Sequence, residues 1–559
     1  MANDLRYNIA DQRLTYSGPK AIQRIDDDYL IEFNQLHSKV LDHFNITLVE
    51  GYINKVSDKI STHSNLGALR NRQLRQSVIL SAALSALAVG LNGHASMKKY
   101  SESERTSALR SELKRANDRT AAQVMAEVLQ RTTETFPRGE EVVIECSITE
   151  GVRVKPGKEA GGNPTIAVGA LFGKKEHRHD YGLNLHPSVT MLSMGNDVID
   201  GTTKSVMGEH SSLTSLFLTE SGVKRHLPDI YVQRWMAGRY FKEFNPREHS
   251  LLEAAEVIAK AYKMKSIDEM TVYFLDRPRH HPPMDEFNKA GVPTPWDKDG
   301  DLFPALLLGE DHLRFPDGRG LSSMIGEIGG SAEWAVGVLP LVWRGGQALG
   351  MLTSQSALTR KDSSAEDKWK SRFHFTEEEL MLIHDARFEH KPYFTIKDIL
   401  EDPYAGGLAA FGAISDNYFY PDLTGVKTDP EKNLLFVNVM VINSLGLVQH
   451  WHFVFQCRHD IADTAHRFNS PKEELLKHSG DELEKRIGKM LEDPVGRKRY
   501  RLFFINEYYP AIIHVRDKML LLHRSIKALI ERGALQPKDE EICDLTVKLA
   551  PEWFAEEDW

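Results

Sequence analysis

Hydrophobic positions change their spacing several times along the chain, and each spacing predicts a different kind of element. Residues 1–75 carry apolar side chains at helical spacing, such as Leu30, Phe33 and Leu36, with few Gly or Pro. Helical spacing continues over 74–129, apart from a polar break near 92–103. We therefore predict helices up to residue 129, with 1–75 forming a helical N-terminal extension.

Beyond residue 139 the pattern alternates between strands and helices. Residues 140–148 are rich in β-branched side chains, which is typical of a strand, and 250–264 has the spacing of an amphipathic helix. Further strand-sized or apolar segments lie at 165–172, 188–194, 213–218, 271–275, 335–343, 434–442 and 447–455. This succession predicts a layered α/β (α+β) fold, followed by a charged, helical C-terminal extension over 456–559.

Composition narrows the class of protein. Of the 559 residues, 41% are hydrophobic and 27% are charged, as in ordinary globular proteins, and the net charge of −9 gives no reason to expect a nucleic-acid partner. The widely separated Cys146, Cys457 and Cys543 indicate neither a disulfide framework nor a thiolate zinc site, so we expect a cytoplasmic protein. The apolar run 78–91 is too short to cross a membrane and predicts a buried helix.

The densest chemical signal is the sequence SMGNDVIDGTTKSVMGEH at 193–210. Here an apolar strand runs into Asp197 and Asp200 just before a turn at Gly201. Both carboxylates and the carbonyl of Ile199 could face one cation, and oxygen ligands of this kind suit Mg²⁺ or Mn²⁺. The same pattern is also typical of a polar turn whose Asp caps the next helix.

The stretch NDVIDGT at 196–202 resembles the Asp-Pro-Ile-Glu/Asp-Gly-Thr signature of the lithium-sensitive, metal-dependent sugar and inositol phosphatases. The following SVMG resembles the class II (GlpX-type) fructose-1,6-bisphosphatase branch of that superfamily. Other stretches resemble the same branch in the same order: KRAND at 114–118, VVIECSITE at 142–150, PDIY at 228–231, LDRPRH at 275–280, DGD at 299–301 and IGGSAEW at 328–334. The similarity spans about 76–455 and implies a sugar-phosphatase fold, with a metal-binding half at 76–245 and a substrate-binding half at 246–455.

The resemblance also implies roles for individual residues. The implied ligands of Mg²⁺ or Mn²⁺ are Asp118, Glu145, Asp197, Ile199, Asp200 and Glu333. The implied catalytic residues are Lys114, Thr202 and Asp200. The implied substrate contacts are Gly201, Thr202, Tyr231, Arg277, Arg279, Asp299 and Asp301.

Plainer interpretations of several of these residues stay open. Arg277 and Arg279 alternate along a predicted strand edge, so both could grip an anionic sugar, but they could also be an ordinary surface pair. Asp299 and Asp301 could accept hydrogen bonds from sugar hydroxyls or could only stabilise a turn. Lys114 could be a solvated lysine at a helix end.

The chain departs from the family pattern at Ser147, where the family has a second carboxylate, and at Trp334, which replaces a glycine and would narrow the pocket or stack on a sugar. The expected function is metal-dependent hydrolysis of a sugar or cyclitol phosphate, with fructose 1,6-bisphosphate as the leading substrate. The alternative is a phosphatase-fold protein that binds a sugar phosphate as a sensor or assembly subunit. Apolar positions on the terminal helices and the family resemblance predict a homo-oligomer, a dimer or tetramer, with no membrane partner.

Overall fold

The fold was described from a computed structural model of the chain. The structure describes residues 5–12, 14–18, 20–57, 65–150, 165–166, 170–174, 177, 188–224, 231–308, 310–353, 391–420 and 422–469. Of the predicted C-terminal extension, only 456–469 falls within these residues, and 470–559 lies outside them.

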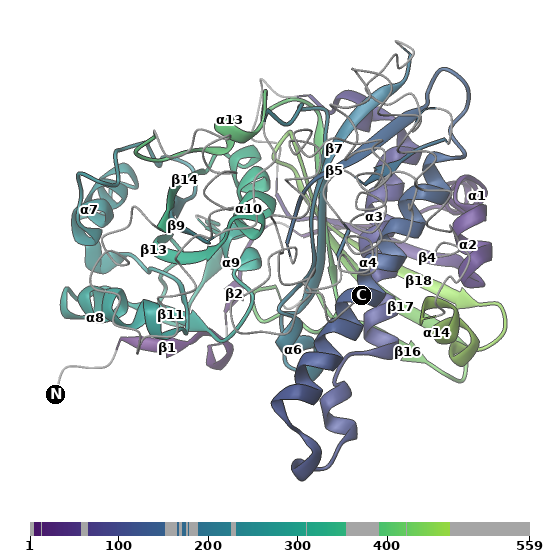
Figure 1. Ribbon diagram of the computed structural model, residues 1–559, viewed down its shortest axis with the longest axis horizontal. Coiled ribbons are helices and arrows are strands. Elements are labelled where there is room, and N and C mark those ends of the chain that lie inside the picture. The colour runs from purple at the N-terminus through teal and green to yellow at the C-terminus, as the bar shows by residue number, and fades with distance from the viewer. Residues whose placement is uncertain are drawn as a thin grey trace, which may run out of the picture.

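A large mixed sheet forms the centre of the molecule (Figure 1). Its strand order is β3-β4-β18-β17-β15-β8-β7-β5-β6, with β16 paired to β17, and β5 runs parallel to β7 while the other neighbours are antiparallel. The strands are β3 (Ala21–Arg24), β4 (Ile46–Lys55), β5 (Val142–Thr149), β6 (Leu171–Phe172), β7 (Thr190–Asp200), β8 (Leu213–Thr219), β15 (Gly407–Ala413), β16 (Lys427–Asp429), β17 (Leu434–Asn443) and β18 (Val448–Cys457).

Helices cover one face of this sheet. They are α1 (Asp27–Leu36), α2 (Ser38–Phe44), α3 (Arg72–Asn92), α4 (Ser107–Thr133) and α14 (Ile461–Asn469). The small Ala and Ser side chains of α3 let it pack closely on both α4 and the sheet, so that Ser85 Oγ donates to the Ala121 carbonyl of α4 at 3.2 Å. By length and composition the helical stretch Arg72–Lys99 could cross a membrane, but 83% of its most apolar window is buried inside this core.

The opposite face packs against a helical layer and a second, smaller sheet (Figure 1). The buried α10 (Ser331–Trp343) and α9 (Leu302–Leu306) lie between the sheets. The second sheet has the order β13-β9-β14, and α7 and α8 cover its far side. These elements are β9 (Tyr231–Ala237), β13 (Ser323–Gly330), β14 (Gln347–Leu352), α7 (Leu251–Ala261) and α8 (His281–Lys289).

Short elements complete the described part of the fold. The strands are β1 (Arg6–Asn8), β2 (Thr15–Tyr16), β10 (Phe274–Leu275), β11 (Thr294–Asp297) and β12 (Leu313–Arg314). The short α-helices are α6 (Thr202–Met207) and α13 (Ile396–Ile399). The 3₁₀ helices are η1 (Ile9–Asp11), η2 (Gly67–Arg70), η3 (Ser96–Lys99), η4 (Glu102–Glu104), η5 (Ile267–Glu269) and η6 (Pro278–His280).

The layered α/β fold predicted from the sequence is confirmed, but two local predictions are wrong. The first 75 residues are not a helical extension, because β3 and β4 join the large sheet while β1 and β2 pair with β11 and β12. The apolar segment 335–343 lies in helix α10 rather than in a strand, because it is buried between two sheets and so is apolar all round. The predicted halves 76–245 and 246–455 stay a prediction, although β15, β17 and β18 of the second half belong to the large sheet.

Candidate functional site

Strand β7 brings two buried aspartates to one end of the large sheet. Asp197 and Asp200 are each 3% exposed. The strand ends at Asp200 because Gly201 has a φ of 75°, a left-handed conformation that favours glycine, and α6 begins at the next residue. The chain thus turns sharply beside two carboxylates.

Other acidic side chains lie close enough to Asp197 and Asp200 to change the pKa of both aspartates. Burial raises the pKa of Asp197 well above its usual range, and the negative charges of Glu150, Asp200, Glu333 and Asp118 raise it further. Burial and then the charge of Asp301 likewise raise the pKa of Asp200, while the ammonium of Lys204 opposes this effect. Acidic side chains from β7, α4 and α10 therefore lie near one another.

Asp118 and Thr202 meet beside the end of β7. The hydroxyl oxygen of Thr202 lies 3.2 Å from Asp118 Oδ1 and 3.1 Å from the carbonyl oxygen of Ile199. A hydroxyl has one proton, so Thr202 donates to one of these two oxygens at a time. The predicted ligands Asp118 and Ile199 are therefore both brought to the same threonine.

Glu145 on β5 and Glu150 just after this strand differ in their distance from this cluster. Glu145 pairs with Ser193, four positions before Asp197, whereas Glu150 follows the strand and its N–H donates to the Asn196 carbonyl at 3.2 Å. At roughly 3.3 Å per residue, the two glutamates are about 16 Å apart along the chain. Glu150 therefore lies near Asp197, whereas Glu145 lies at an earlier position on the strand, further from Asp197. Sequence reasoning missed Glu150, although its place at the end of a strand, beside a Gly, was a usable signal.

Lys114 and Arg277 both lie near Asp299, in the turn at 299–301. Lys114 Nζ donates to Thr203 Oγ1 at 3.0 Å, and the Thr203 N–H donates to Asp299 Oδ2 at 3.0 Å. Arg277 Nη2 donates to Asp299 Oδ1 at 3.2 Å. Burial acts to raise the pKa of Asp299, but the positive charges of Lys114, Arg277 and Lys204 outweigh it and lower the pKa. This carboxylate is held ionised between cations.

A buried lysine that sequence reasoning missed lies next to this turn. Lys204, on α6, donates to Asp297 Oδ2 at 2.5 Å and to the Tyr418 hydroxyl at 2.9 Å. Its positive charge lies close enough to Asp200 to oppose the rise in the pKa of that carboxyl. The burial of this lysine could not be predicted from the sequence, because a lysine two residues after a Gly-Thr turn is ordinarily solvated.

Arg277 and Arg279 do not alternate along a strand edge, because β10 ends at Leu275 and η6 begins at Pro278. Arg277 is partly exposed at the rim. Arg279 donates from Nε and Nη2 to the Ile328 carbonyl at 2.9 and 2.7 Å, and its guanidinium lies over the ring of Tyr231. The two arginines therefore diverge, one towards Asp299 and the other towards β13.

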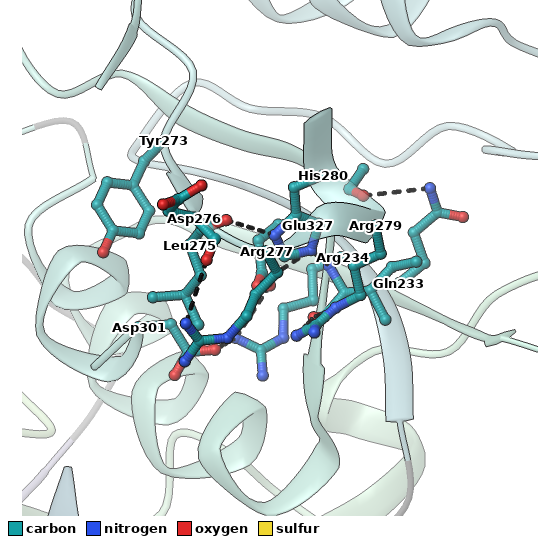
Figure 2. A network of polar contacts seen from close by, with 12 residues as sticks. Gln233, Arg234, Tyr273, Leu275, Asp276, Arg277, Arg279, His280, Asp301 and Glu327 are labelled. Atoms are coloured by element: carbon teal, nitrogen blue, oxygen red, sulfur yellow. Dashed lines mark hydrogen bonds and ion pairs between the residues drawn. The ribbon is translucent and has the colours of Figure 1, made fainter. Parts of the chain in front are cut away.

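The predicted sugar contact Asp301 lies in a buried polar network (Figure 2). Arg234 Nη1 donates to Asp301 Oδ2 at 2.5 Å. Arg234 Nη2 approaches Glu333 Oε2 at 3.3 Å, and that oxygen also accepts the Gly330 N–H at 2.9 Å at the start of α10. Trp334 is 1% exposed and packs against Phe394, so it belongs to the core and does not narrow a pocket.

The donor chemistry of the acidic cluster fits a hard divalent cation. Buried carboxylates that repel one another need a nearby positive charge, and oxygen ligands suit Mg²⁺ and Mn²⁺. Within the part of the chain that the structure describes, however, no three His, Cys, Asp or Glu side chains are already arranged closely enough to hold a metal ion. The carboxylates of this cluster would therefore have to move closer together to bind a cation.

Residues 182–403 match the family model of the bacterial, glpX-encoded fructose-1,6-bisphosphatases. This segment of the chain is therefore similar to a GlpX-type domain. This match includes Asp197, Asp200, Asp299 and Glu333, whereas Asp118 and Glu150 lie before its start.

Known relatives agree with this assignment at modest similarity. A protein of Synechococcus sp. (strain JA-3-3Ab), named D-fructose 1,6-bisphosphatase class 2/sedoheptulose 1,7-bisphosphatase, is 25% identical over 244 residues, which are 43% of this chain and 63% of the relative. A protein of the same name from Trichodesmium erythraeum (strain IMS101) is 24% identical over 177 residues, 32% of this chain and 49% of the relative. The chain therefore matches less than two thirds of the length of these relatives.

Proposed function

We propose that the chain is a divalent-cation-dependent phosphatase that hydrolyses a phosphomonoester of a sugar bisphosphate. The leading substrate is fructose 1,6-bisphosphate, and a sedoheptulose bisphosphate or a cyclitol phosphate is a related possibility. The observation that carries the proposal is the crowding of carboxyl groups at the end of β7, where burial and the charges of Glu150, Asp200, Glu333 and Asp118 raise the pKa of Asp197. The similarity to a GlpX-type domain and the names of the relatives support the substrate class.

The proposed cation ligands are carboxylates and one carbonyl at the end of β7 and on its neighbours. They are Asp118, Asp197, the carbonyl of Ile199, Asp200 and Glu333, with Glu145 from β5 or Glu150 just after it. Bound Mg²⁺ or Mn²⁺ would neutralise charge on the phosphate and make a water molecule more acidic. Thr202 would orient this site, because its hydroxyl is held between Asp118 and Ile199.

Residues around the 299–301 turn would recognise the substrate. Lys114 supplies a positive charge near Thr203 and Asp299, where it would attract the phosphate that is cleaved. Gly201 leaves room for an oxyanion beside its N–H. The other proposed substrate contacts are Thr202, Tyr231, Arg277, Arg279, Asp299 and Asp301.

The test is release of inorganic phosphate by purified protein from a panel of sugar phosphates, with Mg²⁺ or Mn²⁺ added. We expect fructose 1,6-bisphosphate to be hydrolysed by the wild type and not by the Asp200→Asn variant. Asp311→Asn is the matched control, since Asp311 is exposed and pairs with Arg239 on the surface. Absence of turnover above the level of Asp200→Asn, with every substrate and both metals, would refute the proposal.

A second candidate is a protein that binds a sugar phosphate without hydrolysing it, as a sensor or assembly subunit. Ser147, where the family has a carboxylate, and the lack of a preformed metal cluster among the described residues favour it. Calorimetric binding of fructose 1,6-bisphosphate without phosphate release would identify this function. In either case we propose a cytoplasmic homo-oligomer, a dimer or tetramer.

A further inference from the structure

Arg234 is one of the largest fully buried side chains in the described part of the molecule. It lies in β9, the middle strand of the smaller sheet, opposite Glu327 of β13 and Gly350 of β14. Its side chain is only 1% exposed. An arginine at such a position is held by buried partners, and those partners indicate what it does.

The guanidinium of Arg234 connects two parts of the candidate site, and Figure 2 shows Arg234 beside Asp301 and Glu327. Nη1 contacts Asp301 Oδ2 at 2.5 Å, on the turn that also carries Asp299. Nη2 donates to the Gly330 carbonyl at 2.7 Å and approaches Glu333 Oε2 at 3.3 Å, at the start of α10. One planar group thus contacts an acid from the proposed sugar side and an acid from the proposed cation side.

The strand end that Arg234 contacts is itself fixed by other residues. The Ile328 N–H donates to His280 Nε2 at 2.9 Å, and the Ile328 carbonyl accepts both hydrogen bonds from Arg279. Glycine at 329 is required for the close approach, because a Cβ there would lie 2.2 Å from Arg234 Nη2 and 2.6 Å from Asp301 Oδ2. The geometry around the guanidinium is therefore tightly specified.

We propose that Arg234 is a positioning residue that holds Asp301 and Glu333 in place together. This inference rests on the proposed function, because it links sugar recognition to cation binding. Its fork of N–H groups is suited to this role, since separate nitrogens can contact separate acceptors in one plane. A lysine would keep the charge but would present a single nitrogen, which cannot hold both acids in the same way.

The test compares Arg234→Lys with Arg344→Lys. Arg344 is largely buried, with 9% of its side chain exposed, pairs with Glu310 and follows the other end of α10, so it is a matched control away from the site. Mn²⁺ affinity is measured from the concentration of free Mn²⁺, and KM and kcat from phosphate release. For Arg234→Lys we expect Mn²⁺ binding to weaken roughly tenfold, the effect typical of losing a partner that orients a metal ligand, together with a higher KM. Arg344→Lys should change neither value.

Gly329→Ala is the second variant, in case Arg234→Lys does not fold. The added methyl group would push the guanidinium from Asp301 while both charges remain, and Gly337→Ala, whose nearest contact would be 3.3 Å, is its control. We expect Gly329→Ala to weaken Mn²⁺ binding as Arg234→Lys does, relative to Gly337→Ala. If the folded variants bind Mn²⁺ like the wild type, or if the wild type binds no Mn²⁺, Arg234 does not have this role.

The two proposals fail in different ways. If the wild type hydrolyses no substrate but Arg234→Lys still loses Mn²⁺ affinity relative to Arg344→Lys, the phosphatase proposal fails and the positioning role stands. If the wild type is active and Arg234→Lys changes only its melting temperature, Arg234 is structural and the phosphatase proposal stands.

Discussion

At the scale of residues, the buried aspartates at the end of β7 oppose folding when no cation is present. Burial and mutual repulsion raise the pKa of Asp197 and Asp200, so the folded state binds their protons more strongly than the unfolded state does. Stability from this source is present at low pH and is lost as the pH rises above the normal aspartate range. A functional site that destabilises its own protein is a common compromise.

We predict that Asp200→Asn stabilises the metal-free protein while it abolishes activity. Because the amide carries no charge, we expect the free energy of unfolding in EDTA to rise by about 1–2 kcal/mol at about pH 8. The gain should be smaller at about pH 5 than at about pH 8, because a lower pH favours protonation of the wild-type carboxyl. Chemical denaturation at the two pH values measures this, and a metal-free variant less stable than the wild type at the higher pH would contradict it.

A second prediction separates the roles of Glu145, on β5, and Glu150, just after it. Glu150 raises the pKa of Asp197, whereas Glu145 pairs with Ser193 further back on the strand. Glu150→Gln should therefore weaken Mn²⁺ binding by roughly tenfold or more, and Glu145→Gln should have a much smaller effect. The reverse order in a titration of free Mn²⁺ would show that β5 presents Glu145 to the cation instead.

Local motifs could predict the acids of the site but not all of their partners. Asp197 and Asp200 stand beside a glycine turn at the end of an apolar strand, which is a pattern visible in one dimension. Arg234 lies in a segment with no such pattern, and although Lys204 follows the glycine turn, the partners of both residues, Asp301 and Asp297, are distant in sequence. Such pairs arise from how the layers pack and could not be found from spacing.

At the scale of elements, the close approach of α3 to the large sheet depends on small residues. A Cβ at Gly412 of β15 would lie 2.3 Å from the Ala82 carbonyl oxygen and 2.7 Å from Thr214 Oγ1. Neither atom is the free end of a flexible side chain, so the helix would have to move away from the sheet.

Gly412→Ala should accordingly destabilise the protein by about 1–3 kcal/mol, as expected for overpacking of a tight core. Gly337→Ala is the control, because its added methyl group would have 3.3 Å to its nearest neighbour. Melting temperatures measure the difference. Equal melting temperatures for the two variants would mean that α3 is not packed against β15 in this way.

Segments with the length and composition of a strand, or with a helical period, could be predicted, whereas the apolar segment 335–343 could not. The strand-sized segments 434–442 and 447–455 form β17 and β18, and 250–264 contains α7. Segment 335–343 is apolar at every position, and this pattern fits a buried strand as well as the helix α10 that it forms. Strand β4 has the β-branched residues of a strand, but the helical spacing before it dominated the prediction for 1–75.

At the scale of the whole molecule, the layers bring together acids that are far apart in sequence. Asp118 comes from α4 on one face of the large sheet, Asp197 and Asp200 from the sheet, and Glu333 from α10 on its other face. A cation bound among them would therefore join three layers. Binding to the folded state alone stabilises a protein in proportion to the logarithm of ligand concentration.

We predict that Mn²⁺ raises the melting temperature of the wild type and has little effect on Asp197→Asn. At a free Mn²⁺ concentration of about one hundred times the dissociation constant, the stabilisation should be about 2.7 kcal/mol. Differential scanning calorimetry in EDTA and in Mn²⁺ measures it. An equal shift in the wild type and the variant would place the bound cation elsewhere.

The most direct test of the account is a crystal structure with Mn²⁺, in which anomalous scattering locates the ion. The account predicts a peak at the end of β7, within coordination distance of Asp197 and Asp200 and of at least one acid from α4, β5 or α10. Carboxylates that remain apart with no peak between them, at Mn²⁺ concentrations that support phosphate release, would contradict it.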